Sequence, residues 1–371
     1  MPHSIHTFHR WPAEAIATWQ RLAPDRNDPP EARAALLSPP IAAEGCAEAI
    51  ASWVATTPPS SWVEIQLRAI YDDQPTSWYR IATWDSALAT SRRSSFAAQR
   101  DAAGRVATDT LLLNAPPDAL QARVLLCATS EAAELPMLDG LALCMTRSGA
   151  EEERGRQGDE ETINAVGTPS PLLPFFPSPL LLLPHYRSQY SYSGGAGWCS
   201  PTCLSMALAY WHAITGEPAL APFAAAGCVP DLVVPMVYDA LYEGAGNWPM
   251  NTAYAASLGL VAYVTRLHSL DQLARWAAAG VPLIASLAWQ PGELAGAPIE
   301  KSAGHLILIT GVEGERLHVA DPAAAQPAEL ARSYRADQFY KCWQANSAGT
   351  VYIMHPPSWD VPTPGSGDAW G

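Results

Sequence analysis

The stretch from Gln189 to Met206 constrains the fold of this chain more than any other. A glycine-rich segment leads into the sequence W-C-S-P, and an apolar run then continues to Gly216. Because proline fixes φ near the helical value and has no N–H, it is tolerated only in the first turn of a helix. Pro201 therefore predicts that a buried helix begins at or next to Cys199, and Gly216 is a typical stop signal.

A cysteine at the start of a helix is well placed for nucleophilic chemistry. The unpaired N–H groups and the positive end of the helix dipole favour the thiolate, which is the nucleophilic form. The alternative is that Cys199 is only a small buried hydrophobic residue. Cys203, one turn deeper, is expected to be such a residue, because thiols on adjacent turns are poorly aimed at each other for a disulfide.

A nucleophilic cysteine needs a base, and the base needs an orienting group. The apolar run over 302–312 predicts a buried strand with His305 at its mouth. A turn and a second short strand follow, and that strand ends at Asp321, 16 residues after the histidine (321 − 305). This spacing suits a hairpin that returns the carboxylate beside the imidazole, where it can orient the ring and stabilise its charged form.

These residues resemble the papain-like cysteine peptidases of the bacteriocin-leader-processing, or double-glycine, type. The similarity lies in G-W-C-S-P-T-C-L-S-M, G-H-L-I-L-I-T-G-V, V-A-D-P-A-A and the upstream Gln189, and it covers roughly 184–356. The resemblance implies that Cys199 is the nucleophile, His305 the base, Asp321 the orienting acid and Gln189 an oxyanion donor. The phrase G-N-W-P-M-N-T-A-Y at 246–254 also resembles a subgroup of bacterial proteins that join such a domain to a β-rich N-terminal region.

Composition and charge exclude several classes of partner. The net charge of −14 argues against nucleic acids and anionic membranes, since both bind a basic face. No run approaches the roughly 18 apolar residues that a membrane span needs. No signal peptide is evident, and the irregularly spaced cysteines do not resemble a disulfide framework. A cytoplasmic location is therefore expected, with non-classical export as the alternative.

No cofactor or metal is expected either. His3, His6 and His9 recur every three residues, but no cysteine or carboxylate completes a metal set beside them. His212 and His318 are not expected to act as the base, because the first lies far along the helix and the second lies in the middle of a strand.

The first 148 residues predict an all-β, sandwich-like domain. Clean period-two alternation over 61–69, together with turn-rich segments between short apolar runs, is typical of such a fold. Trp62, Trp78 and Trp84 are either rings that stack on a sugar or cell-surface ligand, or core and cross-strand partners, the latter being favoured. The expected strands lie at 50–55, 61–69, 78–84, 105–113, 122–128 and 138–146.

A charged stretch and a proline-rich segment predict a linker and an extended strap over 149–183. A papain-like domain is expected over 184–358 and a tail over 359–371. Its helices after the first are expected at 233–243, 250–258, 269–279 and 335–344, with strands at 281–288, 302–312, 316–320 and 349–354. One helix with the nucleophile, packed on a mainly antiparallel sheet with the base, is an α+β architecture.

The sequence thus predicts a cysteine peptidase-like hydrolase that cleaves peptide amides through a Cys-His-Asp triad and a thioester. Its expected substrate is a peptide or protein. An acyl transferase or amidase with the same triad is the alternative among enzymes. A non-catalytic binding module on a peptidase scaffold is the alternative outside them, and the complete Cys, His and Asp set counts against it.

Overall fold

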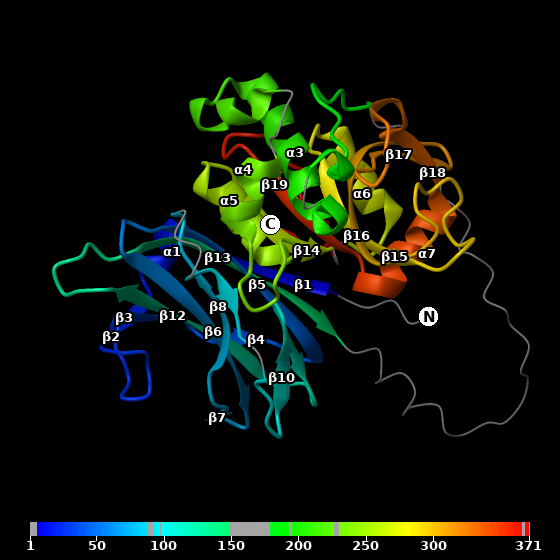
Figure 1. Cartoon of the computed structure of the whole chain (residues 1–371). Helices are drawn as coiled ribbons and strands as arrows, with labels where there is room; N and C mark the ends of the chain where they lie inside the picture. Colours follow the sequence, from blue (N-terminus) through cyan, green and yellow to red (C-terminus); the bar gives the residue numbers. More distant parts are fainter. Residues whose placement is uncertain are drawn as a thin grey trace, which may run out of the picture.

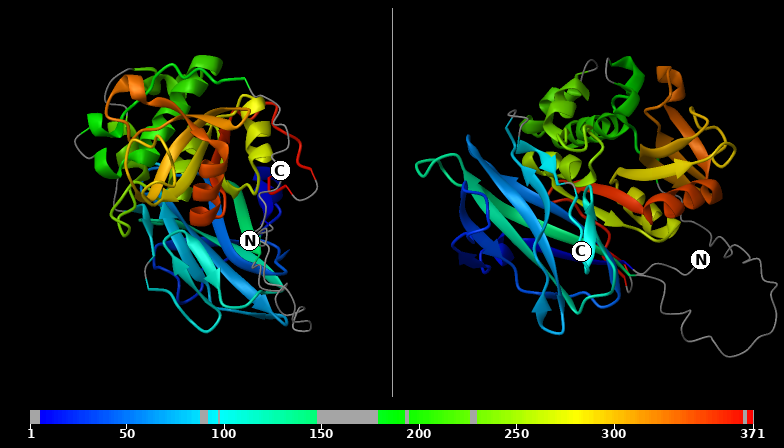
Figure 2. Two further views of the ribbon diagram at one scale, coloured as in Figure 1. Left: turned by 90° about the vertical axis from the view of Figure 1, so that its right-hand side faces the viewer. Right: turned by 60° about the horizontal axis from the view of Figure 1, so that its bottom comes forward.

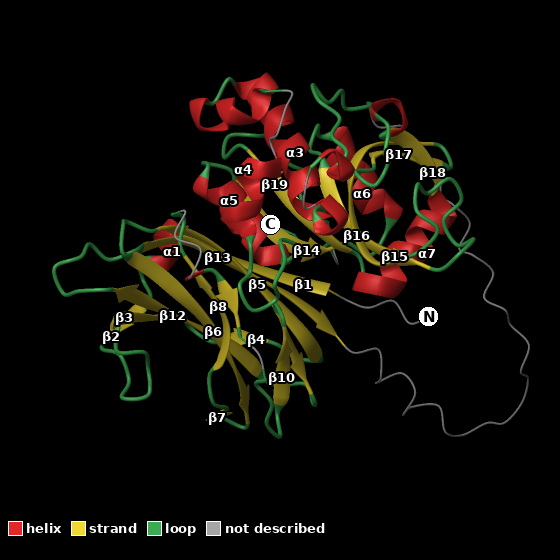
Figure 3. Cartoon of the chain, in the orientation of Figure 1, coloured by secondary structure: helices red, strands yellow, loops and turns green. Residues whose placement is uncertain are grey.

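The structure, a computed structural model, describes residues 6–87, 92–96, 98–147, 179–192, 195–225, 230–365 and 368–370. Most of the expected linker and strap (149–178), together with His3, Gly194 and Cys228, lies outside the described residues. Within them the chain forms an N-terminal half made of strands and a C-terminal half of one sheet and most of the helices (Figures 1 and 3). The expected α+β class and the all-β N-terminal region are confirmed, whereas the domain boundaries at 148, 183 and 358 stay predictions.

The N-terminal half is a pair of antiparallel sheets. Its strands are β1 (His6–Pro12), β2 (Gln20–Leu22), β3 (Ala32–Leu37), β4 (Ile41–Ala42), β5 (Cys46–Thr56), β6 (Ser61–Tyr71), β7 (Gln74–Pro75), β8 (Tyr79–Trp84), β9 (Ser94–Ser95), β10 (Gly104–Ala107), β11 (Thr110–Leu113), β12 (Ala119–Ala128) and β13 (Met137–Arg147), with the short helix α1 (Ala13–Ile16) after β1. One sheet has the order β1-β13-β5-β11-β10 and the other β2-β3-β12-β6-β8-β9. Trp53 of β5 meets Trp84 of β8 with ring centroids 6.4 Å apart, so a sandwich core lies between the sheets.

The outer face of β6 is covered as well as the inner one. The alternating apolar residues of this strand are buried, as the period-two pattern predicts, and so are Glu64 and Gln66 on the other face. Arg80 pairs with Glu64 at 2.7 Å, and Arg123 donates to Gln66 at 2.8 Å. These charged and polar side chains can be buried at low cost, because each of them keeps a hydrogen-bond partner.

The three tryptophans for which a ligand was considered, Trp62, Trp78 and Trp84, have packing partners. Trp84 is fully buried and Trp62 nearly so. The guanidinium of Arg92 lies over the Trp62 ring at 4.2 Å, and that of Arg68 lies over the Trp78 ring at 4.4 Å. These contacts favour the interpretation of the rings as structural partners, and the sugar or cell-surface ligand stays untested.

The C-terminal half packs its helices against one antiparallel sheet. Its elements are η2 (Gln189–Ser191), η3 (Gly195–Gly197), α3 (Cys199–Thr215), η4 (Pro218–Ala224), α4 (Pro230–Val237), α5 (Trp248–Ser257), β14 (Val261–Arg266), α6 (Leu270–Ala278), β15 (Leu283–Trp289), β16 (Ser302–Glu313), β17 (Arg316–Ala320), η5 (Pro327–Glu329), β18 (Ala331–Arg335), α7 (Ala336–Ser347) and β19 (Thr350–His355). The strand order is β14-β19-β15-β16-β17-β18, with α3 and α6 packed on β16 and α7 on β15. No helix within the described ranges is both long and apolar enough to span a membrane.

Two expected elements differ from the structure. The run 105–113 is a hairpin of β10 and β11 and not one strand, with a two-residue turn at Thr108 and Asp109. The helix expected to reach Glu243 ends at Val237, since the side chain of Asp239 accepts hydrogen bonds from Leu241 N and Tyr242 N. Side chains that bond to nearby backbone N–H groups compete with helix formation in this way.

The two halves pack directly on each other. β5 lies against α5 and β14, as the views in Figure 2 also show. The Val264 N–H donates to the Ser52 hydroxyl at 2.9 Å, and Arg266 pairs with Glu48 at 2.6 Å. This contact brings the β10–β11 hairpin, at one edge of its sheet, toward the start of α5.

Candidate active site

Cys199 is the first residue of α3, as Pro201 predicts, and the helix ends at Gly216 in a left-handed cap. Trp198 before it makes no side-chain cap, so its side chain accepts no hydrogen bond from the first N–H groups of the helix. The helix is buried from Ser200 to Trp211 and packs on β16. Because so much of α3 is buried against β16, the Cys199 thiol is held in a fixed position beside the strand that carries His305.

His305 and Asp321 lie beside each other, as the hairpin spacing predicts. The Nε2 atom of His305 is 2.8 Å from Asp321 Oδ1, and both side chains are buried, with 3% and 0% exposed. The hydroxyl of Tyr334 donates to Asp321 Oδ2 at 2.5 Å, and the Ala323 N–H donates to Oδ1 at 2.9 Å. A carboxylate held by this many donors stays ionised even when it is buried.

The thiol of Cys199 and the ring of His305 line the same cleft and lie close enough for each to shift the pKa of the other. Since Nε2 faces Asp321, the other ring nitrogen is left for the thiol. Burial alone would raise the pKa of Cys199, but the hydrogen bond and charge of His305 lower it below the usual value. Burial likewise opposes the charged form of His305, yet Asp321 and Cys199 raise its pKa to about 10. The lowered pKa of Cys199 and the raised pKa of His305 both favour a thiolate–imidazolium pair.

This difference in pKa predicts selective alkylation. At pH 6 iodoacetamide should react with Cys199 roughly tenfold or more faster than with the other described cysteines. Burial raises the pKa of each of these, so they stay protonated at this pH: Cys46, Cys127, Cys144, Cys203 and Cys342. Peptide mapping by mass spectrometry gives the rates, and denatured protein provides the control. Uniform labelling, or earlier labelling of Cys203, would identify a different nucleophile.

Gln189 lies at the same site. Its backbone N–H donates to the carbonyl of Pro322, which ties η2 to the turn after Asp321. Its Nε2 donates to Ala196 O at 3.3 Å, and its buried Oε1 has no hydrogen-bond partner. A Cβ on Gly195 would lie 1.8 Å from the Gln189 carbonyl, so only glycine allows the two loops to approach so closely. The amide thus lies near Cys199, and its oxyanion role stays a prediction.

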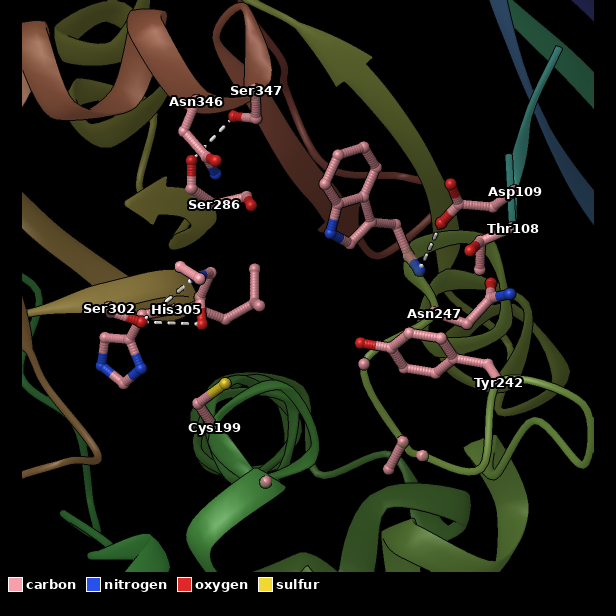
Figure 4. A pocket seen from close by; sticks show the side chains of 18 of the residues that line it. Thr108, Asp109, Cys199, Tyr242, Asn247, Ser286, Ser302, His305, Asn346 and Ser347 are labelled. Carbon is pink, nitrogen blue, oxygen red and sulfur yellow. Dashed lines mark hydrogen bonds between the residues drawn. The ribbon is translucent and has the colours of Figure 1, made fainter. Parts of the chain in front are cut away.

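These residues line a cleft of about 930 Å³. Cys199 and His305 lie on one side of it, with Tyr242, Asn247, Thr108 and Asp109 on the other (Figure 4). The last two belong to the N-terminal half. The cleft is therefore built by both halves of the chain.

Among the histidines that the structure describes, only His305 lines the cleft. His6 of β1 bonds to Thr146 of β13, His212 lies near the carbonyl of Glu217, and His318 pairs with Glu313. In the part of the chain that the structure describes, no three His, Cys, Asp or Glu side chains are arranged to hold a metal ion.

Sequence reasoning missed several residues of the site. Tyr334 lies on β18, a short strand that the pattern did not reveal, and it reaches Asp321 because Leu317 and Tyr334 pair across β17 and β18. The ring of Trp289 contacts His305 edge-on, with centroids 5.6 Å apart. The aromatic residue that ends β15, just before a long loop, was the only local signal for this contact.

Comparison with known proteins gives two family matches. Residues 13–146 match the Peptidase C39 N-terminal domain, and residues 184–351 match the Peptidase_C39 like family. No curated protein matches the sequence. A crystal structure described as a C39-like peptidase from Bacillus anthracis is 14% identical over 43% of this chain and 90% of that chain, with a TM-score of 0.31. A likeness this low carries no argument about the present chain.

Proposed function

We propose that the protein hydrolyses peptide bonds with Cys199, His305 and Asp321. The proposal rests first on the two family matches, the Peptidase C39 N-terminal domain over residues 13–146 and the Peptidase_C39 like family over residues 184–351. Membership supports a cysteine peptidase-type hydrolase. The observation that carries the finer assignment is that Cys199 lies beside His305, which is hydrogen-bonded to the buried Asp321, at a cleft of about 930 Å³.

In this proposal the Cys199 thiolate attacks the peptide carbonyl carbon and forms a tetrahedral oxyanion. The imidazolium of His305 then gives its proton to the leaving amine, and the C–N bond breaks to leave a thioester. Neutral His305 takes a proton from water, which attacks the thioester and releases the acid and the thiolate. Asp321 stabilises the imidazolium throughout. The Cys199 N–H and the Gln189 amide donate to the oxyanion.

The acceptor of the acyl group separates a peptidase from an acyl transferase. We expect a peptide library to give the same free-acid products with and without added amine, because water reaches the thioester through the open cleft. Mass spectrometry of the products measures the partition. A product that forms only with amine would favour the acyl transferase with the same three residues. Binding of peptides without any turnover would favour a non-catalytic module.

A cytoplasmic location is also part of the proposal. A low-pKa thiol stays reduced in such a compartment. Fractionation of the source cells measures it, and recovery of the protein only outside the cells would contradict it.

A further inference from the structure

The wall of the cleft opposite Cys199 comes from the N-terminal half. β10 and β11 form a tight hairpin whose two-residue turn, Thr108 and Asp109, lines the cleft beside Asn247 and Tyr242 (Figure 4). Thr108 has a φ of +55°, which is uncommon for a β-branched residue. The hairpin is held in place because β11 pairs with β5, and β5 packs against α5.

Asp109 is a nearly buried carboxylate with only neutral partners. It is 9% exposed, accepts a hydrogen bond from Trp248 N at 3.2 Å, and accepts another from the Thr110 hydroxyl at 3.0 Å. Each carboxylate oxygen can therefore accept further hydrogen bonds, and Asp109 is one of the residues that line the cleft. Among the described residues it forms no ion pair, although burial of an unpaired charge is costly. The charge of Arg266, which pairs with Glu48, lowers the pKa of Asp109 but offsets only part of the effect of burial. Burial raises its pKa to about 6, so it is still ionised at pH 7.5.

The cleft as a whole has unmatched negative charge. Its lining includes the carboxylates Glu48, Asp109 and Glu243 against one guanidinium, Arg266, which is already paired with Glu48 at 2.6 Å. The thiolate and imidazolium at the other end offset each other. Besides burial, the charges of Cys199 and Asp109 both raise the pKa of Tyr242, so this ring lies within reach of both groups.

A second polar group at the cleft, the side-chain oxygen of Gln189, also lacks a hydrogen-bond partner. The buried Oε1 of Gln189, on the side of Cys199, accepts no hydrogen bond. Buried polar atoms of this kind are rare and mark places where a ligand donor fits.

We propose that Asp109 is a specificity-determining residue that binds a lysine or arginine side chain of the peptide substrate. The N-terminal half thereby completes the substrate site. A cationic side chain would supply the counter-charge that Asp109 lacks, through a charge-assisted hydrogen bond. This inference rests on the proposed function, since it assigns the substrate of the same site.

The test compares lysine with norleucine, which keeps the apolar stem of lysine and lacks its ammonium. Capped decapeptides, randomised except for one scanned position that holds lysine or norleucine, are hydrolysed by the full chain. At one position we expect kcat/KM to be about tenfold or more higher for lysine. Asp109→Asn, whose amide oxygen can still accept from Trp248 N, should lower kcat/KM for the lysine peptide to the level of the norleucine peptide. Glu134→Gln removes the same charge from an exposed site and should keep the preference.

Binding to the Cys199→Ala protein, followed by fluorescence anisotropy, provides an arm that does not need turnover. Lysine-selective binding that Asp109→Asn abolishes, without turnover by wild type, supports the role of Asp109 and overturns the peptidase assignment. Turnover or binding without a lysine preference, or with a preference that survives in Asp109→Asn, overturns the inference. Asp109→Ser serves as a second neutral variant if thermal unfolding shows that the first does not fold.

Discussion

Replacement of Cys199 by alanine is expected to lower kcat for peptide hydrolysis on the order of 10⁴-fold or more, with the fold retained. The change removes the only nucleophile of the proposed reaction, so no thioester forms. It leaves the start of α3 intact, because Trp198 makes no side-chain cap there and alanine is the best helix former. Steady-state kinetics and thermal unfolding measure the two outcomes separately.

The matched control is Cys203→Ala, one turn deeper in the same helix. Cys203 is fully buried, and its thiol donates to Leu306 O at 3.3 Å. Its loss should lower the free energy of unfolding by about 1 kcal/mol and change kcat only a few-fold. Similar losses of activity in both variants would contradict the assignment of Cys199.

His305→Ala is expected to be nearly as severe as the loss of the thiol, because residues that act as one unit give non-additive losses. Without the imidazolium the thiol loses the hydrogen bond and the charge that lower its pKa, and the leaving amine loses its proton donor. Asp321→Asn should be milder, since the amide oxygen can still accept from His305 Nε2. His318→Ala, on β17 near the surface, should leave kcat unchanged and serves as the control.

The same variants give a pH dependence with a definite sign. Asp321 raises the pKa of His305 to about 10, so the imidazolium needed as proton donor persists to high pH. Asp321→Asn removes the charge that raises this pKa. The basic limb of the kcat profile should therefore move to lower pH in this variant. A basic limb that stays in place would show that Asp321 does not control the imidazole.

The local part of the site could be predicted from the sequence. Proline, cysteine and glycine signals fix the two ends of α3, and the spacing of His305 and Asp321 predicts a hairpin that the register of β16 and β17 confirms. These inferences depend on contacts between residues close in sequence or on rules that hold for any helix or hairpin. That these residues are catalytic stays a prediction, since geometry does not demonstrate turnover.

The other residues of the site could not be predicted, because they depend on contacts between residues far apart in the sequence. Tyr334 reaches Asp321 through β18, a strand with an ordinary polar composition. Asp109 and Thr108 lie in the cleft only because β5 docks on α5, an arrangement set by surface fit between the two halves. The early end of α4 likewise depends on Asp239, whose carboxylate also accepts from Ser95 N in the other half. Tertiary packing of this kind overrides local propensity.

The measurement that tests the central claim most directly is mass spectrometry of the acid-quenched enzyme. The full chain is mixed with an activated peptide ester, quenched within the first turnover and digested. The account predicts an added acyl mass on the peptide that contains Cys199, which disappears in Cys199→Ala and on treatment with hydroxylamine. An acyl group on another residue, or hydrolysis that persists in Cys199→Ala, would contradict it.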